Sequence, residues 1–355
     1  MTVSTLTVLA LSLFLTGCQL PYLMSGAVEQ VKILSSRQKI EKAIESVAVD
    51  EKTKVKLSYA LKAKDYAAKN GLNCKKNFGT YVQLDRPFVS YLVIASPKNE
   101  VKAKTWSFPI VGSFPYKGFF SEKKAKREVR KLKKKDLDTY MRGVTAYSSL
   151  GWFKEPILSS MLKHSKESLA DTIFHECFHG SFFVKDNVEK NEQLAVFVGH
   201  HYLLRFLEEI GDEKKYREDA MSWEEQKLFT SFLEKTLTQA QDFYTKNKDQ
   251  QDYQDYQEEV AEQKREKLFK SIADSYRSDL KPKLKANNYD SVFLKDLNNA
   301  KIVAFKTYFH KFEVLENLLA TEFNGDIFAM VNTLSNLKNK KKQLEYLRAN
   351  GLLEK

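Results

Sequence analysis

The chain has 355 residues, of which 43% are hydrophobic and 29% are charged, so it is a folded, soluble-type chain with enough residues for two cores or one large core. It contains no internal repeat, no glycine-rich phosphate loop and no transmembrane helix. Much of the net charge of +12 lies between residues 121 and 135, which include nine basic and two acidic residues. No aromatic side chains interleave this basic run, which argues against nucleic acid as a partner.

The N-terminus is predicted to be a lipoprotein signal. Residues 6–15 are apolar but too few to span a bilayer. They end in Leu15-Thr16-Gly17-Cys18, which resembles a bacterial lipobox and implies cleavage before Cys18 and acylation of Cys18. Gln19 then favours the outer membrane, with the protein facing the periplasm. An uncleaved anchor or a soluble N-terminus is the alternative.

Apolar residues at helical spacing predict helices over residues 20–46 and 50–70, the second ended by Gly71. Short strands are predicted at residues 81–84 and 91–95, within 106–120, and within 138–149. Between the last two regions, Lys123 to Lys135 form a basic helix. Its outer face is either simply solvated or attracted to anionic membrane lipid.

An H-E-x-x-H motif, HECFH, occupies residues 175–179. Apolar positions around it recur at helical spacing and predict a helix that ends near residue 184. Residues four apart share one face of a helix, so His175 and His179 can reach one metal ion, and Glu176 can act as general base toward an activated water. Two buried histidines satisfied by hydrogen bonds would show the same pattern.

The following helix offers a third ligand. Asp186 and Glu189 have the pattern of a capping box, which starts that helix. If the turn is centred between residues 185 and 186, His179 and Glu192 stand equally far from it, on antiparallel helices about 8–10 Å apart. Glu192 is therefore the predicted third ligand, and Glu189 and the histidines at 200 and 201 are the alternatives. Two histidines, a glutamate and an open fourth position favour Zn²⁺, one per chain.

The three cysteines do not suggest a disulfide framework. Cys18 is predicted to carry lipid, Cys74 to be an unpaired thiol in a loop, and Cys177 to face the core from the metal helix.

Beyond Gly211 the sequence is helical and highly charged, with amphipathic stretches at 268–280 and 292–319. The predicted fold is α+β and predominantly α-helical. A small sheet packs beside the metal helix and the glutamate-bearing helix, and a long helical part follows. The expected divisions are a signal peptide (1–17), a lipid-anchored N-terminal helix (18–48), a zinc-peptidase core (49–211) and a helical C-terminal domain (212–355).

Several segments resemble one family of bacterial proteins, the predicted zinc aminopeptidase lipoproteins. They are Cys18 at the lipobox, WSFPIVG at 106–112, YKGFF at 116–120, AYSSLGWF at 146–153, PILSSML at 156–162, HECFH at 175–179, NEQLA at 191–195, NNA at 298–300 and Tyr308. The likeness spans roughly residues 18–319 and is most specific from 106 to 199. It implies peptide hydrolysis with zinc, in a protein tethered to the cell envelope.

More distantly, the pair Asn191-Glu192 resembles the gluzincins, in which the glutamate ligand lies on the helix after the motif. The gap from His179 to Glu192 is shorter here, which implies a tight hairpin. Val196 stands where thermolysin-like enzymes have an acid that steadies a histidine ligand. Asp171, one turn before the first histidine of the motif, is the expected substitute, and Asn191 is expected to support the ligands.

The sequence therefore predicts a membrane-anchored zinc metallopeptidase, an aminopeptidase by resemblance, that acts on peptides. By the same resemblance Tyr308, and second Tyr147, would stabilise the oxyanion. Residues 146–149 are the expected edge strand for substrate pairing, or else an ordinary internal strand. No acidic residue stands out as the group that binds a free substrate amine, so endopeptidase action stays open. The alternative function is a non-catalytic envelope lipoprotein that uses the metal-helix scaffold to bind a partner.

Overall fold

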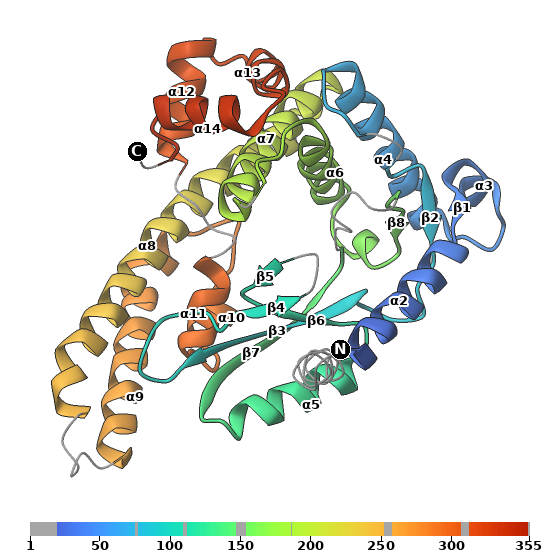
Figure 1. The fold of residues 1–355 in the computed structure, drawn as a ribbon. Helices are drawn as coiled ribbons and strands as arrows, with labels where there is room; N and C mark the ends of the chain where they lie inside the picture. The colour runs from blue at the N-terminus through green and yellow to red at the C-terminus, as the bar shows by residue number, and fades with distance from the viewer. Residues whose placement is uncertain are drawn as a thin grey trace, which may run out of the picture.

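The computed structural model describes residues 20–74, 77–108, 112–146, 154–185, 187–251, 258–306 and 312–353. Within these residues the protein is mainly helical with three small sheets, which confirms the predicted fold class (Figure 1). No helix in the described ranges is long and apolar enough to cross a bilayer.

The helices are α2 (Leu20–Ser35), α3 (Ile40–Glu45), α4 (Glu51–Lys69), α5 (Glu122–Lys133), α6 (Lys166–Ser181), α7 (Val188–Glu209), α8 (Glu213–Gln251), α9 (Glu258–Ser275), α10 (Asp290–Phe293), α11 (Asn299–Lys306), α12 (Glu313–Phe323), α13 (Ile327–Ser335) and α14 (Lys340–Ala349). The strands are β1 (Gln38–Lys39), β2 (Thr80–Val82), β3 (Ser90–Pro97), β4 (Trp106–Phe108), β5 (Gly112–Phe114), β6 (Lys117–Phe119), β7 (Leu137–Val144) and β8 (Ile157–Leu158).

The largest strand pairing is in the antiparallel sheet β6-β3-β7, with Val93 of the central strand opposite Met141 of β7. Side chains alternate between the two faces of a strand, so β3 contributes side chains to two separate hydrophobic clusters. Tyr91, Val93 and Ala95 pack with Ala125 and Leu132 of α5. Ile94, from the opposite face, packs with Ala300 and Ala304 of α11. The sheet is thus covered by α5 on one side and α11 on the other (Figure 1).

A smaller sheet has the strand order β1-β2-β8, and its last strand precedes α6, the helix that contains the H-E-x-x-H motif. Strand β8 runs parallel to β2, with Tyr81 opposite Ile157. Both residues are buried in the same core as α4, α6 and α7. This pairing fixes the segment just before α6 against the body of the protein.

The main core extends from α2 to the C-terminus. It joins α4, α6 and α7 to buried leucines of α12, α13 and α14, while α8 and α9 form a separate apolar cluster with α10 and α11. The boundary expected at residue 211 stays a prediction.

Three local expectations need correction. Helix α7 is capped by Asn187, whose side chain accepts a hydrogen bond from the backbone N–H of Lys190, and not by Asp186. Helix α6 ends at Ser181, because Phe182 already has extended backbone angles. The helix predicted over residues 20–46 is instead two helices, α2 and α3, with the short strand β1 between them.

Candidate metal site

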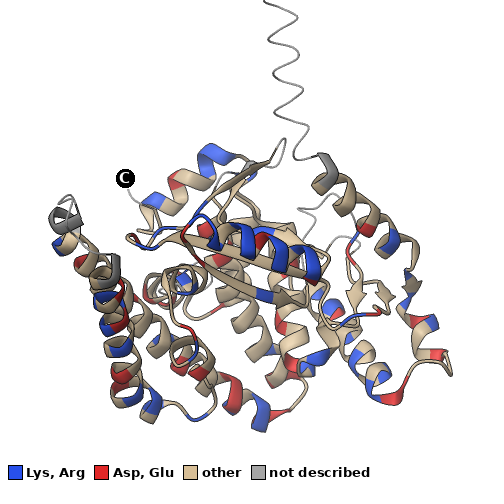
Figure 2. Ribbon diagram, turned by 90° about the horizontal axis from the view of Figure 1, so that it is seen from below, with Lys and Arg blue, Asp and Glu red and all other residues tan. Residues whose placement is uncertain are grey.

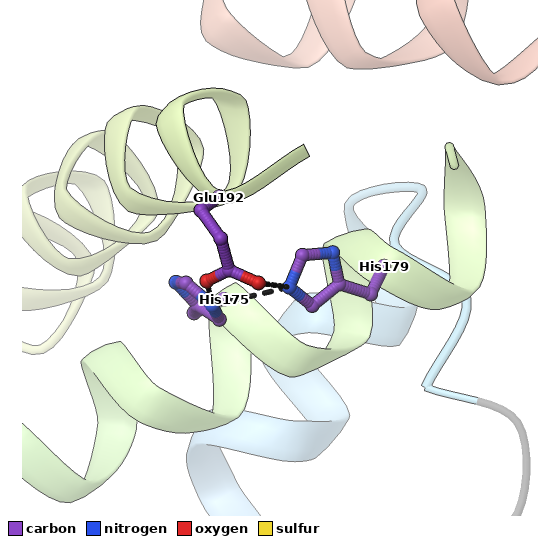
Figure 3. Close-up of side chains that lie close together, drawn as sticks. All are labelled: His175, His179 and Glu192. Carbon is purple, nitrogen blue, oxygen red and sulfur yellow. Dashed lines mark hydrogen bonds and ion pairs between the residues drawn. The ribbon is translucent and has the colours of Figure 1, made fainter. Parts of the chain in front are cut away.

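Helices α6 and α7 form an antiparallel hairpin that brings three potential ligands together. His175 and His179 project from α6, and Glu192 projects between them from α7 (Figure 3). The Nε2 atoms of the histidines are 3.2 Å apart, and Glu192 carboxylate oxygens lie 3.3 Å from His175 Nε2 and 3.5 Å from His179 Nε2. Among the described residues these three form the cluster of metal-ligating groups, and Glu189, His200 and His201 are not part of it.

The dimensions of this triangle suit zinc. Ligands at about 2.0–2.1 Å from a tetrahedral zinc stand about 3.3 Å from one another. The two histidine Nε2 atoms are 3.2 Å apart, and each lies near a different oxygen of the Glu192 carboxylate, His175 at 3.3 Å from Oε2 and His179 at 3.5 Å from Oε1. With one donor atom taken from each residue, all three lie within 4.8 Å of one another, so the three groups can converge on one ion. Two imidazoles and a carboxylate are also the donor types that zinc takes in hydrolytic sites, where a fourth position stays open.

Asn191 holds the hairpin closed beside Glu192. Its side-chain amide donates to the carbonyl of Val184 and accepts from the N–H of Val184, both at 2.8 Å. Asn191 is 1% exposed, so these two bonds are shielded from water. Because they pin the connecting segment to the first turn of α7, they set the position of Glu192 relative to α6.

Asp171 lies one turn before His175 and packs against Gly199 of α7. A Cβ atom on Gly199 of α7 would stand 2.9 Å from Asp171 Oδ1, 3.3 Å from the Asp171 carbonyl oxygen and 3.4 Å from His175 N. Glycine is therefore required there for the helices to lie this close. Burial raises the pKa of Asp171 to about 6, although the charge of His175 opposes the shift. The two groups interact electrostatically, as expected for a carboxylate that supports a ligand.

The two histidines have different electrostatic surroundings. Burial alone would lower the pKa of His175, but its hydrogen bond to Glu192 and the nearby carboxylates outweigh burial and raise it. Burial, and next the charge of His175, lowers the pKa of His179 to about 4. The imidazole of His179 is thus neutral at neutral pH, which is the state that a metal ion requires of a histidine ligand.

Glu176 lines a cavity. Its cavity neighbours include Thr172 of the same helix, Leu158 of β8, Ala146 and Glu155. Burial raises the pKa of Glu176 to about 7, with His175 opposing the shift and Glu155 adding to it. Ala146 and Lys154, which flank the segment 147–153, also line this cavity. The carboxylate that was predicted to act as general base therefore borders a cavity and directly follows a predicted ligand in the sequence.

A disulfide joins Cys74 to Cys177, which lies between the two histidines of the motif. The expectation of an unpaired Cys74 is therefore wrong. Helix α4 packs along α6, and this brings the loop after α4 onto the metal helix across a sequence separation of 103 residues. Asn73 strengthens the contact, because its N–H donates to Ser181 Oγ at 2.7 Å and its side chain donates to the Gly180 carbonyl.

Tyr308 and Tyr147 lie outside the described residues, as do Cys18 and most of the expected edge strand at 146–149. Sequence reasoning missed Gly199 and Glu155. A glycine inside an apolar helix could have signalled the close approach, whereas no local pattern marks Glu155.

The site belongs to the class in which an H-E-x-x-H helix is followed at once by a helix that carries a glutamate. Within that class, the chain is a member of the family described as "Putative aminopeptidase", whose sequence model matches residues 21–347. This match confirms the resemblance to an aminopeptidase family and favours peptidase activity. Neither the curated proteins nor the solved structures yielded a match.

Proposed function

We propose that this protein is a zinc-dependent peptidase in which His175, His179 and Glu192 hold the metal. The observation that carries the proposal is the convergence of three donor groups: the histidine Nε2 atoms are 3.2 Å apart, and the two Glu192 carboxylate oxygens lie 3.3 Å from one and 3.5 Å from the other. Glu176, which follows His175 in the sequence, lines a cavity. A hydrogen-bonded histidine pair would not need a carboxylate from a second helix between its rings. The family match supports peptide as the substrate class.

The residues of the chain then have distinct tasks. Zinc bound to the triangle would act as a Lewis acid that activates a water molecule and polarises the scissile carbonyl. Glu176 would accept a proton at its carboxylate and would donate it to the leaving amine. Asn191 and Asp171 orient the ligand-bearing turns, the first through Val184 and the second beside His175. Tyr308, with Tyr147 second, is proposed as the donor to the oxyanion.

The proposed location is the bacterial cell envelope, with a lipid on Cys18 and the protein facing the periplasm. Disulfides persist in exported proteins and are rare in reducing compartments, so the bond between Cys74 and Cys177 supports export. Cys18 stands two positions before the first residue of α2, which leaves a short link between lipid and fold.

The first test is metal content. Wild-type protein purified without added metal should contain about one zinc per chain, as expected for a single site with three protein ligands. Glu192→Ala should lose zinc, while Glu176→Gln should keep zinc and lose peptide hydrolysis. Glu189→Ala is the matched control, because this exposed glutamate lies on the same helix one turn earlier and should change neither property.

Activity on peptides with free and with acetylated N-termini should separate aminopeptidase from endopeptidase action. Cleavage of the free peptides alone is expected from the family description. A wild-type protein that holds no zinc, even after zinc is offered and dialysed away, would contradict the proposal. Zinc binding without hydrolysis of any peptide would favour the envelope scaffold that binds a partner.

A further inference from the structure

Helix α2 exposes an apolar face to solvent. Met24, Val28 and Val31 are 59%, 54% and 64% exposed, and their spacing places them along one side of the helix. The opposite side is engaged with the protein, where Ile33 is 3% exposed. Scattered apolar residues are common on surfaces, but a continuous row on one helix indicates a contact with something apolar.

Helix α5 exposes a basic face. It buries Ala125 and Leu132 against the sheet, and its outward positions carry lysine and arginine. The exposed basic residues of this helix and the turn after it are Lys123, Lys124, Lys126, Arg127, Arg130, Lys131, Lys133, Lys134 and Lys135. Figure 2 shows this helix as a nearly unbroken row of basic residues across the view. The acidic residues of the helix, Glu122 and Glu128, leave most of this charge unbalanced.

The two faces meet at the start of α2. Lys124 Nζ of α5 donates to Ser25 Oγ of α2 at 2.6 Å. Tyr22 of α2 donates its hydroxyl proton to the Gly118 carbonyl at 2.8 Å, and Lys117 Nζ lies 4.7 Å from the centre of the Tyr22 ring. The apolar row of α2 therefore begins beside the basic row of α5, and both lie next to the part of the chain that follows Cys18.

We propose that the exposed faces of α2 and α5 form one surface that lies on an anionic lipid bilayer. Apolar side chains of an interfacial helix enter the boundary between headgroups and acyl chains, and adjacent lysines and arginines bind anionic headgroups. A membrane-binding surface beside a lipidated cysteine adds a second attachment to the bilayer and fixes the orientation of the protein on it. This surface does not depend on peptidase activity.

The placement of α5 also orients the metal site. Helices α6 and α7 lie on the other side of the sheet from α5 (Figure 1). A protein resting on α2 and α5 would therefore keep the triangle of His175, His179 and Glu192 away from the lipid and open to peptides in solution.

Lysine footprinting on vesicles tests the surface. The full chain is reconstituted into phosphatidylcholine vesicles with or without phosphatidylglycerol, and protein that floats with the vesicles is treated with an amine-acetylating reagent. Each basic residue near an anionic surface strengthens binding by about fivefold. A lysine bound to a headgroup is shielded from the reagent, so the acetylation of Lys123 and Lys134 should be at least about fivefold slower on the anionic vesicles. Concentrated salt should reverse this protection.

Lysines on α14 are the internal control. Lys341 and Lys342 are exposed on a helix at the opposite end of the molecule from α5 (Figure 1). They should be acetylated equally fast on both kinds of vesicle. Equal labelling of Lys123 and Lys134 on both kinds, or failure of the chain to float with either, would overturn the proposal.

A variant tests the part played by α2. Val28→Glu with Val31→Glu should restore fast labelling of the α5 lysines on anionic vesicles, because charged side chains cannot enter the apolar boundary. Val314→Glu, at a residue 44% exposed on α12, is the matched control and should leave the protection unchanged. Unchanged protection in the double variant would show that α2 does not contribute, and would overturn the combined surface.

Discussion

Asn191→Ala removes the side chain that ties the end of the α6–α7 turn to the start of α7. Two hydrogen bonds of 2.8 Å are lost, and the buried N–H and carbonyl of Val184 are left without these partners. A typical hydrogen bond contributes about 1 kcal/mol, and leaving a buried polar group unpaired costs about 1–3 kcal/mol. We therefore expect the free energy of unfolding to fall by about 2–4 kcal/mol.

The same substitution should weaken zinc binding. Glu192 follows Asn191 directly, and its oxygens are within 3.3 and 3.5 Å of the two histidine Nε2 atoms only while the turn is held in place. Loss of groups that orient metal ligands costs about 10–100-fold in affinity. Competition with a fluorescent zinc chelator measures this change, and denaturant unfolding of metal-free protein measures stability.

A matched control variant distinguishes a displaced Glu192 from a general loss of protein stability. Asn299 is also fully buried, and its side chain donates to the carbonyls of Pro97, Lys98 and Glu100, on the sheet covered by α11. Asn299→Ala should lower stability by a similar amount without changing zinc affinity. If Asn191→Ala binds zinc within twofold of wild type while it loses stability, the claim that Asn191 positions Glu192 is refuted.

Three further predictions concern the same core. Gly199→Ala should lower the free energy of unfolding by about 1–3 kcal/mol, because the new Cβ would lie 2.9 Å from the Asp171 carboxylate. The same substitution at an uncrowded helical position would raise the stability of a protein. Denaturant unfolding measures the sign of the change, and an increase in stability would contradict the crowding at this position. Replacing Cys74 and Cys177 together by serine should lower the free energy of unfolding by about 4–5 kcal/mol, because the disulfide closes a long loop in the unfolded chain. Equal unfolding midpoints of the wild-type protein with and without reductant would contradict this prediction. Burial lowers the pKa of His200 to about 3 in the folded protein, whereas its pKa in the unfolded chain is near 6.5. The unfolded chain therefore binds a proton more readily than the folded protein. The free energy of unfolding is unaffected by this histidine above pH 6.5 and decreases as the pH falls from 6.5 toward 3. Between pH 7 and pH 5 wild type should lose about 2 kcal/mol more than His200→Gln, and parallel pH profiles of the two proteins would count against it.

The sequence was sufficient for the local features of the site. The H-E-x-x-H spacing depends only on the 3.6-residue repeat of a helix, and the placement of Glu192 depends only on the length of the turn between two helices. Both are properties of a short segment, so the pairing of His179 with Glu192 could be anticipated without knowledge of the rest of the fold. The apolar spacing likewise predicted α4, including its end at Gly71, where φ is +93°.

Only the tertiary structure decided the contacts between distant segments. The bond between Cys74 and Cys177 requires α4 to lie along α6, and nothing near either cysteine encodes that packing. Glu155 likewise joins Glu176 in one cavity only because β8 pairs with β2 and draws the preceding residues against α6. Helical spacing could predict α2 but not that Val28 and Val31 would stay exposed, because exposure depends on what the rest of the chain covers. Local periodicity is thus set by backbone geometry, whereas burial and long-range pairing are set by the packing of the whole chain.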